Sequence, residues 1–245
     1  MEALLAGLIQ RVSLGDRAAV IGDIHGSADL LRRLLGQLEG LPIVVAGDLC
    51  DRGSDTRGVL DQLVAVGAIG VLGNHDLWLR DWANGRGFDD FALHRAMGGR
   101  ATLASYGVDP ESSVAQIEAA SWRVPESHGR FLDGLPLALS VGVGGEDFWV
   151  VHAGLLRQLE FPPEPRRRVD WLVRTHGERM CWGKCHPVQC VEADVPVVMG
   201  HVPLSAPEDN GHCVAIDTGA GTWGEAGCLT ALILPERRFL SVSGL

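Results

Sequence analysis

The sequence predicts an α/β fold in which a helical insertion interrupts a sheet, and three observations support this. Short, continuous apolar runs recur along the chain and several stop at a glycine, as expected for strands that are buried on both faces. Segments with helical spacing separate the early runs, and such alternation is typical of α/β proteins. Asp, His and Asn gather where the runs end.

Seven apolar runs are candidate strands: residues 18–21, 43–46, 68–72, 149–151, 195–199, 213–216 and 229–234. Between the first two runs, a helix is predicted from the spacing of Leu30, Leu31, Leu34, Leu35 and Leu38. Either Ser27 or Asp29 is a candidate cap for this helix. A second helix is predicted between the next two runs, from the spacing of Val59, Leu60, Leu63, Val64 and Val66.

The middle of the chain has a different pattern. From about residue 77 to residue 136 the spacing is helical and no clear strand interrupts it. We therefore expect a helical insertion between two halves of a sheet, where such insertions commonly shape a substrate cleft. A chain of 245 residues that is 46% hydrophobic can bury one large core, and no linker or repeat divides it. We expect a single domain over residues 1–245.

The charge of the chain limits its partners. The net charge is −10 and no basic face is visible, which argues against binding of duplex nucleic acid. No apolar run reaches the roughly 18 residues that a membrane span needs. The first ten residues lack the basic start of an export signal. The sequence thus predicts a cytoplasmic protein with no membrane partner, and it predicts no particular oligomeric state.

The six cysteines are expected to be reduced thiols. Four residues that can bind metal lie close together, which raises the question of a zinc site; they are Cys181, Cys185, His186 and Cys190. Their spacing, C-x3-C-H-x3-C, departs from the C-x2-C spacing that structural zinc sites favour. Cysteines in loops or in the core are therefore the preferred interpretation.

Polar side chains follow five of the predicted strands. The segments are GDIHG (22–26), GDLCDRG (47–53), GNHD (73–76), HAG (152–154) and GH (200–201). Because ligands of α/β sheets bind just beyond the carboxyl ends of strands, these segments are expected to meet in one place. A single match of this kind would be weak evidence. Three in order, separated by 25 and 26 residues and followed by two histidine segments, are strong evidence.

The chemistry of these residues predicts a metal centre. Asp and Asn supply oxygen ligands and neutral His supplies nitrogen, a set that suits Mn, Fe, Zn and similar divalent ions. Six candidate ligands exceed what one tetrahedral ion takes, so two ions that share a bridging carboxylate are expected. The candidates are Asp23, His25, Asp48, Asn74, His152 and His201. Two neighbouring metals can hold a phosphoryl group between them.

At this point the sequence resembles the phosphoprotein phosphatase (PPP) family of calcineurin-like metallophosphoesterases, whose signature is G-D-x-H-G, G-D-x-x-D-R-G and G-N-H-[DE]. The resemblance runs from about residue 20 to residue 234. Asp76 after His75, and the segments 98–107, 200–203 and 216–220, resemble the bacterial and phage members. Lambda-type protein phosphatases and symmetrical dinucleoside tetraphosphatases share these motifs. The resemblance implies an α/β/β/α sandwich with a helical insertion.

The resemblance also implies a role for each motif residue. Asp23 and His25 would hold a first metal, Asp48 would bridge two, and Asn74, His152 and His201 would hold the second. Arg52 would bind phosphate oxygens, as its fork of donors suits. His75, oriented by Asp51, would protonate the leaving oxygen. The implied reaction is direct hydrolysis by a hydroxide that bridges the metals, without a phospho-enzyme. Manganese is the expected metal, with Fe, Zn, Ni, Co and Mg as alternatives.

One position departs from the family. Members often carry a second phosphate-binding arginine in a W-x-R segment, where this chain has Trp182-Gly183-Lys184. Lysine keeps the charge but loses the bidentate geometry. Lys184 is therefore either a substrate-binding residue or a surface lysine, and Arg174 or Arg179 could replace it in that role.

Several other residues receive structural interpretations. Asp76 is expected to orient a neighbouring ligand, and Asp217 to stabilise a turn. Trp78, Trp82 and Phe88 follow the His75 motif and are expected to form the core of the insertion, with stacking on a substrate base as the alternative. The histidines outside the motifs are expected to lie on the surface or in the core; they are His94, His128, His176, His186 and His212.

The sequence predicts the type of reaction more firmly than it predicts the substrate. The first choice is a phosphatase that acts on phosphoserine, phosphothreonine or phosphotyrosine in proteins. The second is a hydrolase that splits dinucleoside tetraphosphates symmetrically, which needs room for two nucleosides. A non-catalytic phosphate-binding module is disfavoured because every catalytic motif is intact. The insertion is expected to decide between the first two.

Overall fold

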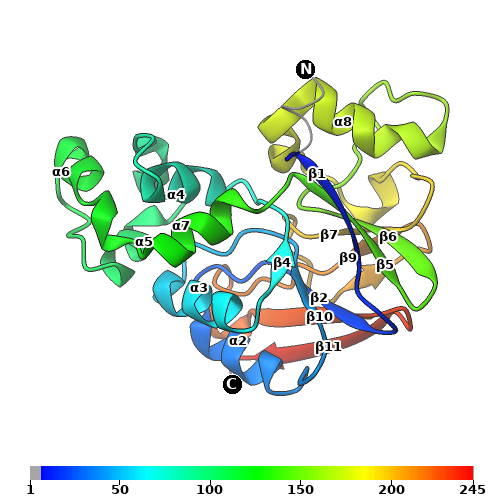
Figure 1. Cartoon of the computed structure of the whole chain (residues 1–245), viewed down its shortest axis with the longest axis horizontal. Coiled ribbons are helices and arrows are strands. Elements are labelled where there is room, and N and C mark those ends of the chain that lie inside the picture. The colour runs from blue at the N-terminus through cyan, green and yellow to red at the C-terminus, as the bar shows by residue number, and fades with distance from the viewer. Residues whose placement is uncertain (1–6, 245) are drawn as a thin grey trace.

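The computed structural model of the chain describes residues 7–244. Two β-sheets face each other, with helices packed outside them (Figure 1). This arrangement confirms the predicted α/β/β/α sandwich. The part of the N-terminal segment that precedes residue 7, discussed above for its lack of an export signal, lies outside the described residues.

The first sheet has five strands in the order β11-β10-β2-β3-β4. Strands β2 (Ala18–Ile21), β3 (Ile43–Val45) and β4 (Ile69–Gly70) run parallel to one another. Strands β10 (Cys228–Leu234) and β11 (Arg238–Ser243) extend the sheet in antiparallel fashion. The parallel part brings the carboxyl ends of β2, β3 and β4 to one edge of the sandwich.

The second sheet has six strands in the order β1-β5-β6-β7-β9-β8. Its central strands are β6 (Glu146–Val151), β7 (Val197–Met199) and β9 (Cys213–Ala215), which run parallel. Strands β1 (Ile9–Ser13) and β5 (Ala138–Val143) pair beside β6, and the two-residue β8 (Glu208–Asp209) closes the far edge.

Alternating side chains of the two sheets form the core between them. Val20, Val44, Phe148, Val198 and Val214 belong to this inner cluster, and each is fully buried. Their sequence neighbours point to the other faces of the sheets, under the helices, as the period of two requires. Burial of each such side chain contributes roughly 1.5–3 kcal/mol, so the sandwich is a firm support for the loops at its edge.

Helices α2 (Ala28–Leu35) and α3 (Thr56–Ala65) cover the five-stranded sheet. Leu31 and Leu34 of α2 are fully buried, which fits the predicted leucine spacing. Asp55 caps α3 by accepting a hydrogen bond from Gly58 N at 2.8 Å. Ser27 stands at the start of α2, but its side chain makes no capping hydrogen bond.

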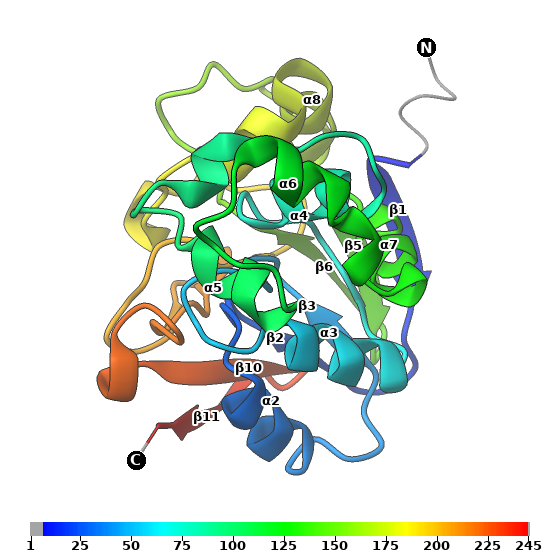
Figure 2. The same ribbon diagram turned by 90° about the vertical axis from the view of Figure 1, so that its left-hand side faces the viewer.

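The predicted helical insertion lies between β4 and β5 and projects from one side of the sheets (Figure 1). In Figure 2 it faces the viewer, in front of both sheets. Trp78, Trp82 and Phe88 pack against one another, and Tyr106 packs against Trp82, so these rings form the core of the insertion as expected. Its helices are α4 (Asp76–Ala83), η1 (Asp90–Leu93), α5 (Gly99–Ser105), α6 (Val114–Ala119), η2 (Ser121–Arg123) and α7 (Glu126–Asp133).

A second helical segment joins β6 to β7. It contains η3 (Pro165–Arg167), α8 (Arg168–His176), η4 (Gly177–Trp182) and η5 (Pro187–Gln189), and a further short helix, η6 (Gly224–Ala226), precedes β10. The candidate strands did not include β1, β5, β8 and β11, and the structure adds these four. Among residues 7–244, no helix combines the length and apolarity that a bilayer span requires.

Candidate metal and phosphate site

Asp48 lies at the centre of a cluster of polar side chains between the two sheets. Its Oδ1 is 3.3 Å from His152 Nε2, and its Oδ2 is 3.5 Å from His25 Nε2. The three residues follow β3, β6 and β2, respectively, and all are buried. The carboxyl ends of strands from both sheets therefore deliver these ligand types to one point, as the sequence predicted.

Two histidines of the cluster have fixed ring orientations. His25 Nδ1 lies 2.8 Å from Cys50 O, and His152 Nδ1 lies 2.8 Å from Ala46 O. Since a carbonyl oxygen only accepts, each Nδ1 carries a proton, and each Nε2 faces the Asp48 carboxylate. A hydrogen bond of this kind on the outer nitrogen is the usual support of a metal-binding imidazole.

Asn74 and His201 lie on the His152 side of Asp48. His152 Nε2 is 3.1 Å from Asn74 Oδ1 and 3.2 Å from His201 Nδ1. The Asp23 carboxylate accepts a hydrogen bond from the backbone N–H of His201, with both oxygens at 3.1 Å. Two triads have ligand atoms close enough to share an ion, namely His25, Asp48 and His75, and Asp48, His152 and His201. Asp23 belongs to neither triad, and His75, predicted as an acid, belongs to one.

The backbone at this site is strained. Of the non-glycine residues with positive φ in the described chain, His25, Asp48, Asp51, Arg52 and His201 all belong to the predicted site, and Arg237 alone lies outside it. Each such residue costs on the order of 1–3 kcal/mol, so the surrounding structure must hold it in place. Strain of this kind concentrates at functional sites.

Two glycines make room for the carboxylates. A Cβ at Gly73 would lie 2.1 Å from Asp48 Oδ1, and a Cβ at Gly200 would lie 2.0 Å from Asp23 Oδ1. Any larger residue would therefore displace a carboxylate of the cluster. The positions before Asn74 and His201 must therefore be glycine, because a side chain there would collide with the neighbouring carboxylate.

Asp76 holds the loops behind Asp48 in position. Its carboxylate accepts hydrogen bonds from the backbone N–H groups of Asp48 and Leu49, each at 2.8 Å, and from Gly73 N at 2.9 Å. The side chain points away from the cluster centre and binds the backbone that carries it. This agrees with its predicted orienting role. Asp217 likewise accepts from Gly219 N at 2.9 Å and stabilises a turn.

His75 and Asp51 form a hydrogen-bonded dyad. His75 Nδ1 donates to Asp51 Oδ2 at 2.7 Å, which leaves Nε2 facing Arg52 and Asp48. Asp51 is fully buried and accepts two further hydrogen bonds, from Trp78 Nε1 at 3.1 Å and from Thr102 Oγ1 at 2.9 Å. The sequence does not predict either of these two hydrogen bonds to Asp51. Thr102 lies in the segment 98–107, but nothing in that segment indicates a contact with Asp51.

Arg52 stands at the exposed rim of the cluster. Its Nη1 lies 2.6 Å from His25 Nε2 and 2.7 Å from Thr222 Oγ1, while its Nη2 lies 3.1 Å from His75 Nε2. The guanidinium is thus aimed across the mouth of the site, where a phosphate would approach. The His25 lone pair that accepts from Arg52 is also the one that metal ligation needs, so these two interactions exclude each other.

Electrostatics test whether the cluster suits divalent ions. Burial lowers the pKa of His25 and of His201 to about 3 each, so both rings are neutral, which is the metal-binding form. Burial and the neighbouring charge of Asp217 raise the pKa of Asp23 well above its usual value. A divalent ion would relieve this repulsion between buried carboxylates. The donor set and its charge therefore fit the ions that the sequence predicted.

Asp48 and His152 each shift the pKa of the other. Burial alone would lower the pKa of His152, but the charge of Asp48 raises it to about 10. Conversely, burial opposes ionisation of Asp48, yet the charges of His152 and His75 hold its pKa well below the usual value. The pair is thus an internal ion pair. A metal that took the His152 lone pair would have to displace its proton.

Lys184 lies at the edge of the site. It is the only lysine in the chain, it is exposed, and its charge contributes to lowering the pKa of His201. It therefore lies within electrostatic reach of the cluster. Of the alternatives, Arg174 pairs with Asp170 at 2.6 Å on α8.

Two clefts open at different ends of the cluster. The Asn74 cleft, of about 460 Å³, is lined by Asn74, Arg86, Phe88, Phe91, Glu178 and Trp182 among others. The Arg52 cleft, of about 600 Å³, is lined by residues that include Arg32, Arg33, Arg52 and Gly53. No residue lines both. Asn74 contacts His152 and Arg52 contacts His25, so the two clefts border the cluster at different residues.

Comparison with known proteins gives consistent matches. The profile of the calcineurin-like phosphoesterases matches residues 17–238. A symmetrical bis(5'-nucleosyl)-tetraphosphatase of Acidovorax sp. (strain JS42) is 34% identical over 144 residues, which are 56% of this chain and 44% of that protein. The asymmetrical bis(5'-nucleosyl)-tetraphosphatase PrpE of Anoxybacillus flavithermus is 27% identical over 91% of this chain and 92% of that protein.

Among solved structures, one described as a candidate diadenosine tetraphosphatase has a TM-score of 0.60. It is 21% identical and covers 96% of this chain and 98% of its own. A likeness of this degree shows a shared fold. The match to the Acidovorax protein spans less than half of that relative's length.

Proposed function

Because the chain belongs to the calcineurin-like phosphoesterase family and is thus a phosphoester hydrolase, we propose that it hydrolyses dinucleoside tetraphosphates at the Asp48 cluster. The names of relatives that match over both partial and nearly full length support this substrate class. It was the second choice from the sequence. Protein phosphatase activity, the first choice, stays a prediction.

The observation that carries the proposal is the pair of clefts. A dinucleoside tetraphosphate has a phosphate chain in its middle and a nucleoside at each end, so it needs space on both sides of the reacting centre. The Asn74 cleft and the Arg52 cleft provide such space at different ends of the cluster. A phosphorylated side chain presents a single phosphate to the cluster, and only the peptide on either side of it could enter the clefts.

The ligands of two divalent ions would come from the cluster around Asp48. Asp23 and His25 would hold one ion, Asn74, His152 and His201 the other, and Asp48 both. Bound divalent ions supply Lewis-acid chemistry, since they neutralise charge that builds on a phosphoryl group during its transfer. Manganese is our proposal for the ion, because oxygen and nitrogen donors without thiolate suit it.

The chain's own residues perform the remaining tasks. The Arg52 guanidinium, aimed across the mouth of the site, binds phosphate oxygens and orients the chain for attack. When Arg52 binds the phosphate instead of His75 Nε2, His75 would donate a proton from Nε2 to the leaving phosphate oxygen, and Asp51 fixes its ring through Nδ1. The leaving group of a dinucleotide is a nucleoside phosphate, a better leaving group than the alkoxide of a phosphoserine.

A side-by-side assay tests the proposal. Manganese-loaded protein would be given diadenosine tetraphosphate or a phosphoserine peptide, with and without EDTA, and the products separated by chromatography. We expect kcat/KM for the dinucleotide to exceed that for the peptide at least tenfold, and EDTA to abolish both activities. ADP alone would show central cleavage, whereas ATP with AMP would show off-centre cleavage. Preference for the peptide, or activity that survives the chelator, would refute the proposal.

A further inference from the structure

Two exposed aromatic rings meet at the mouth of the Asn74 cleft. Phe91, in η1 of the insertion, and Trp182, the last residue of η4, are 46% and 44% exposed. Their ring centroids lie 6.1 Å apart with the planes tilted by 53°. Among the exposed Phe and Trp residues of the described chain, these two alone contact each other. They come from segments 91 residues apart, so the fold brings them together.

The pair is supported from behind. The other side of Phe91 stacks on His94, with the ring planes only 12° apart. Arg80 of α4 binds Asp81 Oδ1 at 3.0 Å and Glu178 Oε1 of η4 at 2.8 Å, which ties the insertion to the segment that carries Trp182. The two rings are therefore held as the sides of an opening rather than left as independent surface residues.

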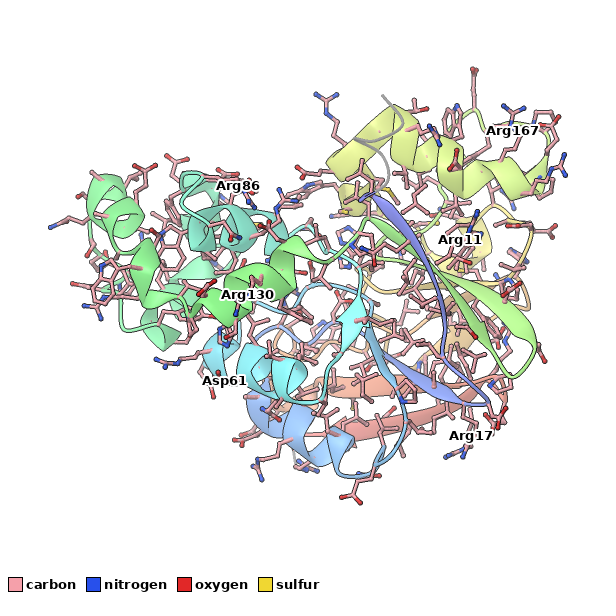
Figure 3. The ribbon with its side chains drawn as sticks, in the orientation of Figure 1. Arg11, Arg17, Asp61, Arg86, Arg130 and Arg167 are labelled. Atoms are coloured by element: carbon pink, nitrogen blue, oxygen red, sulfur yellow. The ribbon has the colours of Figure 1, made fainter. Side chains whose placement is uncertain are left out.

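The charged residues that line the cleft are mostly acidic, and they lie beside apolar residues such as Phe88 and Met97. Asp81, Asp89, Glu118 and Glu178 line it, together with Arg86, which is held by Asp81 and Asp133 (Figure 3 shows Arg86 on the insertion). Carboxylate oxygens accept hydrogen bonds from exocyclic amino groups, whereas they repel phosphate. Such a wall suits the base of a nucleotide and keeps its phosphates outside, over the cluster.

The cleft adjoins the site of chemistry at Asn74. This residue lines the cleft, and its Oδ1 lies 3.1 Å from His152 Nε2 of the cluster. A ligand in the cleft can therefore reach the cluster past Asn74.

We propose that Phe91 and Trp182 bind a nucleobase that carries an amino group, such as adenine, in the Asn74 cleft while the phosphates occupy the Asp48 cluster. This inference rests on the proposed function and names the residues that recognise its substrate. A flat ring stacks on an aromatic side chain irrespective of sequence, and loss of such a platform typically weakens binding by roughly tenfold or more. A basic peptide side chain is the competing occupant of an acidic cleft.

Kinetics of matched variants test the inference. We would measure kcat and KM for diadenosine tetraphosphate, and Ki for inorganic phosphate, in the wild type and in Trp182→Ala, Phe91→Ala and Trp182→Phe. Trp122→Ala is the control, because Trp122 is 75% exposed on the insertion and lies outside the cleft. The alanine variants should raise KM roughly tenfold with little change in kcat. Trp182→Phe should restore most of the binding, and Ki for phosphate should stay within about twofold because the cluster is untouched.

A second measurement uses the wild type alone. AMP and ribose 5-phosphate differ only in the base, so AMP should inhibit at least tenfold more tightly, and Trp182→Ala should remove the difference. Unchanged KM in both alanine variants, or equal inhibition by the two ligands, would overturn the inference while hydrolysis of the dinucleotide stands. Tighter inhibition by an arginine-rich peptide than by AMP would assign the cleft to a peptide instead. A wild type that binds phosphate but leaves the dinucleotide intact would overturn the proposed function together with this inference.

Discussion

The strand-end cluster and the helical insertion are built in opposite ways. The cluster consists of buried polar groups on strained backbone, each fixed by hydrogen bonds to neighbouring loops, as Asp48 is by Asp76. The insertion has an aromatic core of its own and presents exposed rings and carboxylates to the Asn74 cleft. The difference indicates a division of labour, in which the cluster carries out phosphoester chemistry and the insertion selects what is brought to it.

The largest effect is expected from Asp48→Asn. An amide cannot supply the charge that holds His25 and His152 or bridge two ions, so the variant should lose metal and activity together, with kcat/KM down about 1,000-fold or more. Metal analysis and turnover would be measured side by side, with Asp147→Asn, exposed on β6, as the control. Retention of both ions would contradict the bridging role.

Next in size is His75→Asn. Asn cannot protonate a leaving oxygen, so kcat should fall roughly 100-fold or more while metal content stays at the wild-type level. The loss should be larger for an alkyl phosphate than for the dinucleotide, because the nucleoside phosphate needs less help to leave. His186→Asn, at an exposed position, serves as the control. Full activity with either substrate would remove His75 from the role of acid.

A smaller effect is expected from Thr102→Val, because Thr102 connects the insertion to the cluster. Thr102 belongs to α5 of the insertion, and its hydroxyl donates to Asp51 and accepts from Asp51 N. Its loss should leave the Asp51 carboxylate less well held and lower kcat by roughly tenfold. Thr102→Ser keeps the hydroxyl and should retain activity. An equal loss of kcat in the two variants would show that the Thr102 hydroxyl does not support Asp51.

These three residues also show how far sequence reasoning reaches. The ligand types and the His75–Asp51 pair could be predicted because each follows an apolar run whose carboxyl end reaches the same edge. Thr102 could not, since its contact with Asp51 joins residues 51 positions apart through helix packing. The positive φ values at His25, Asp48 and His201 were equally hidden, because Asp and His tolerate a left-handed backbone better than most residues but do not by themselves indicate one.

The fold was predicted with similar limits. Strands whose residues are all apolar, such as β2 and β3, were visible as continuous runs. Strand β1 (IQRVS) is only partly buried and carries polar residues, so its pattern is not that of a buried strand. Trp182 was noted for its place beside Lys184 and not as a partner of Phe91. Their proximity depends on how α8 and the insertion pack, which one sequence does not display.

The smallest expected effect concerns stability and arises where α7 of the insertion packs against α3. Burial lowers the pKa of His128 below its usual 6.5, against the opposing effect of Asp61, while Tyr106 and Arg57 are the other groups near it (Figure 3 shows Asp61 on α3). The unfolded chain therefore binds this proton more readily, so stability should fall as pH drops below about 6.5. The slope is at most about 1.4 kcal/mol per pH unit. Urea unfolding at pH 7.5 and 5.5 should show a smaller difference in His128→Gln than in the wild type. An unchanged difference would exclude His128 as its source.

The division of labour itself is tested most directly by one comparison of two substrates. Diadenosine tetraphosphate and inorganic tripolyphosphate have the same kind of scissile bond, but only the first carries bases. We would measure kcat/KM for both in the wild type, in His75→Asn and in a variant that combines Phe91→Ala with Trp182→Ala. The account predicts that His75→Asn lowers both values by a similar factor, whereas the double variant lowers only the value for the dinucleotide. A double variant that lowers both values equally would contradict the account, because the insertion would then act on the chemistry rather than on the choice of substrate.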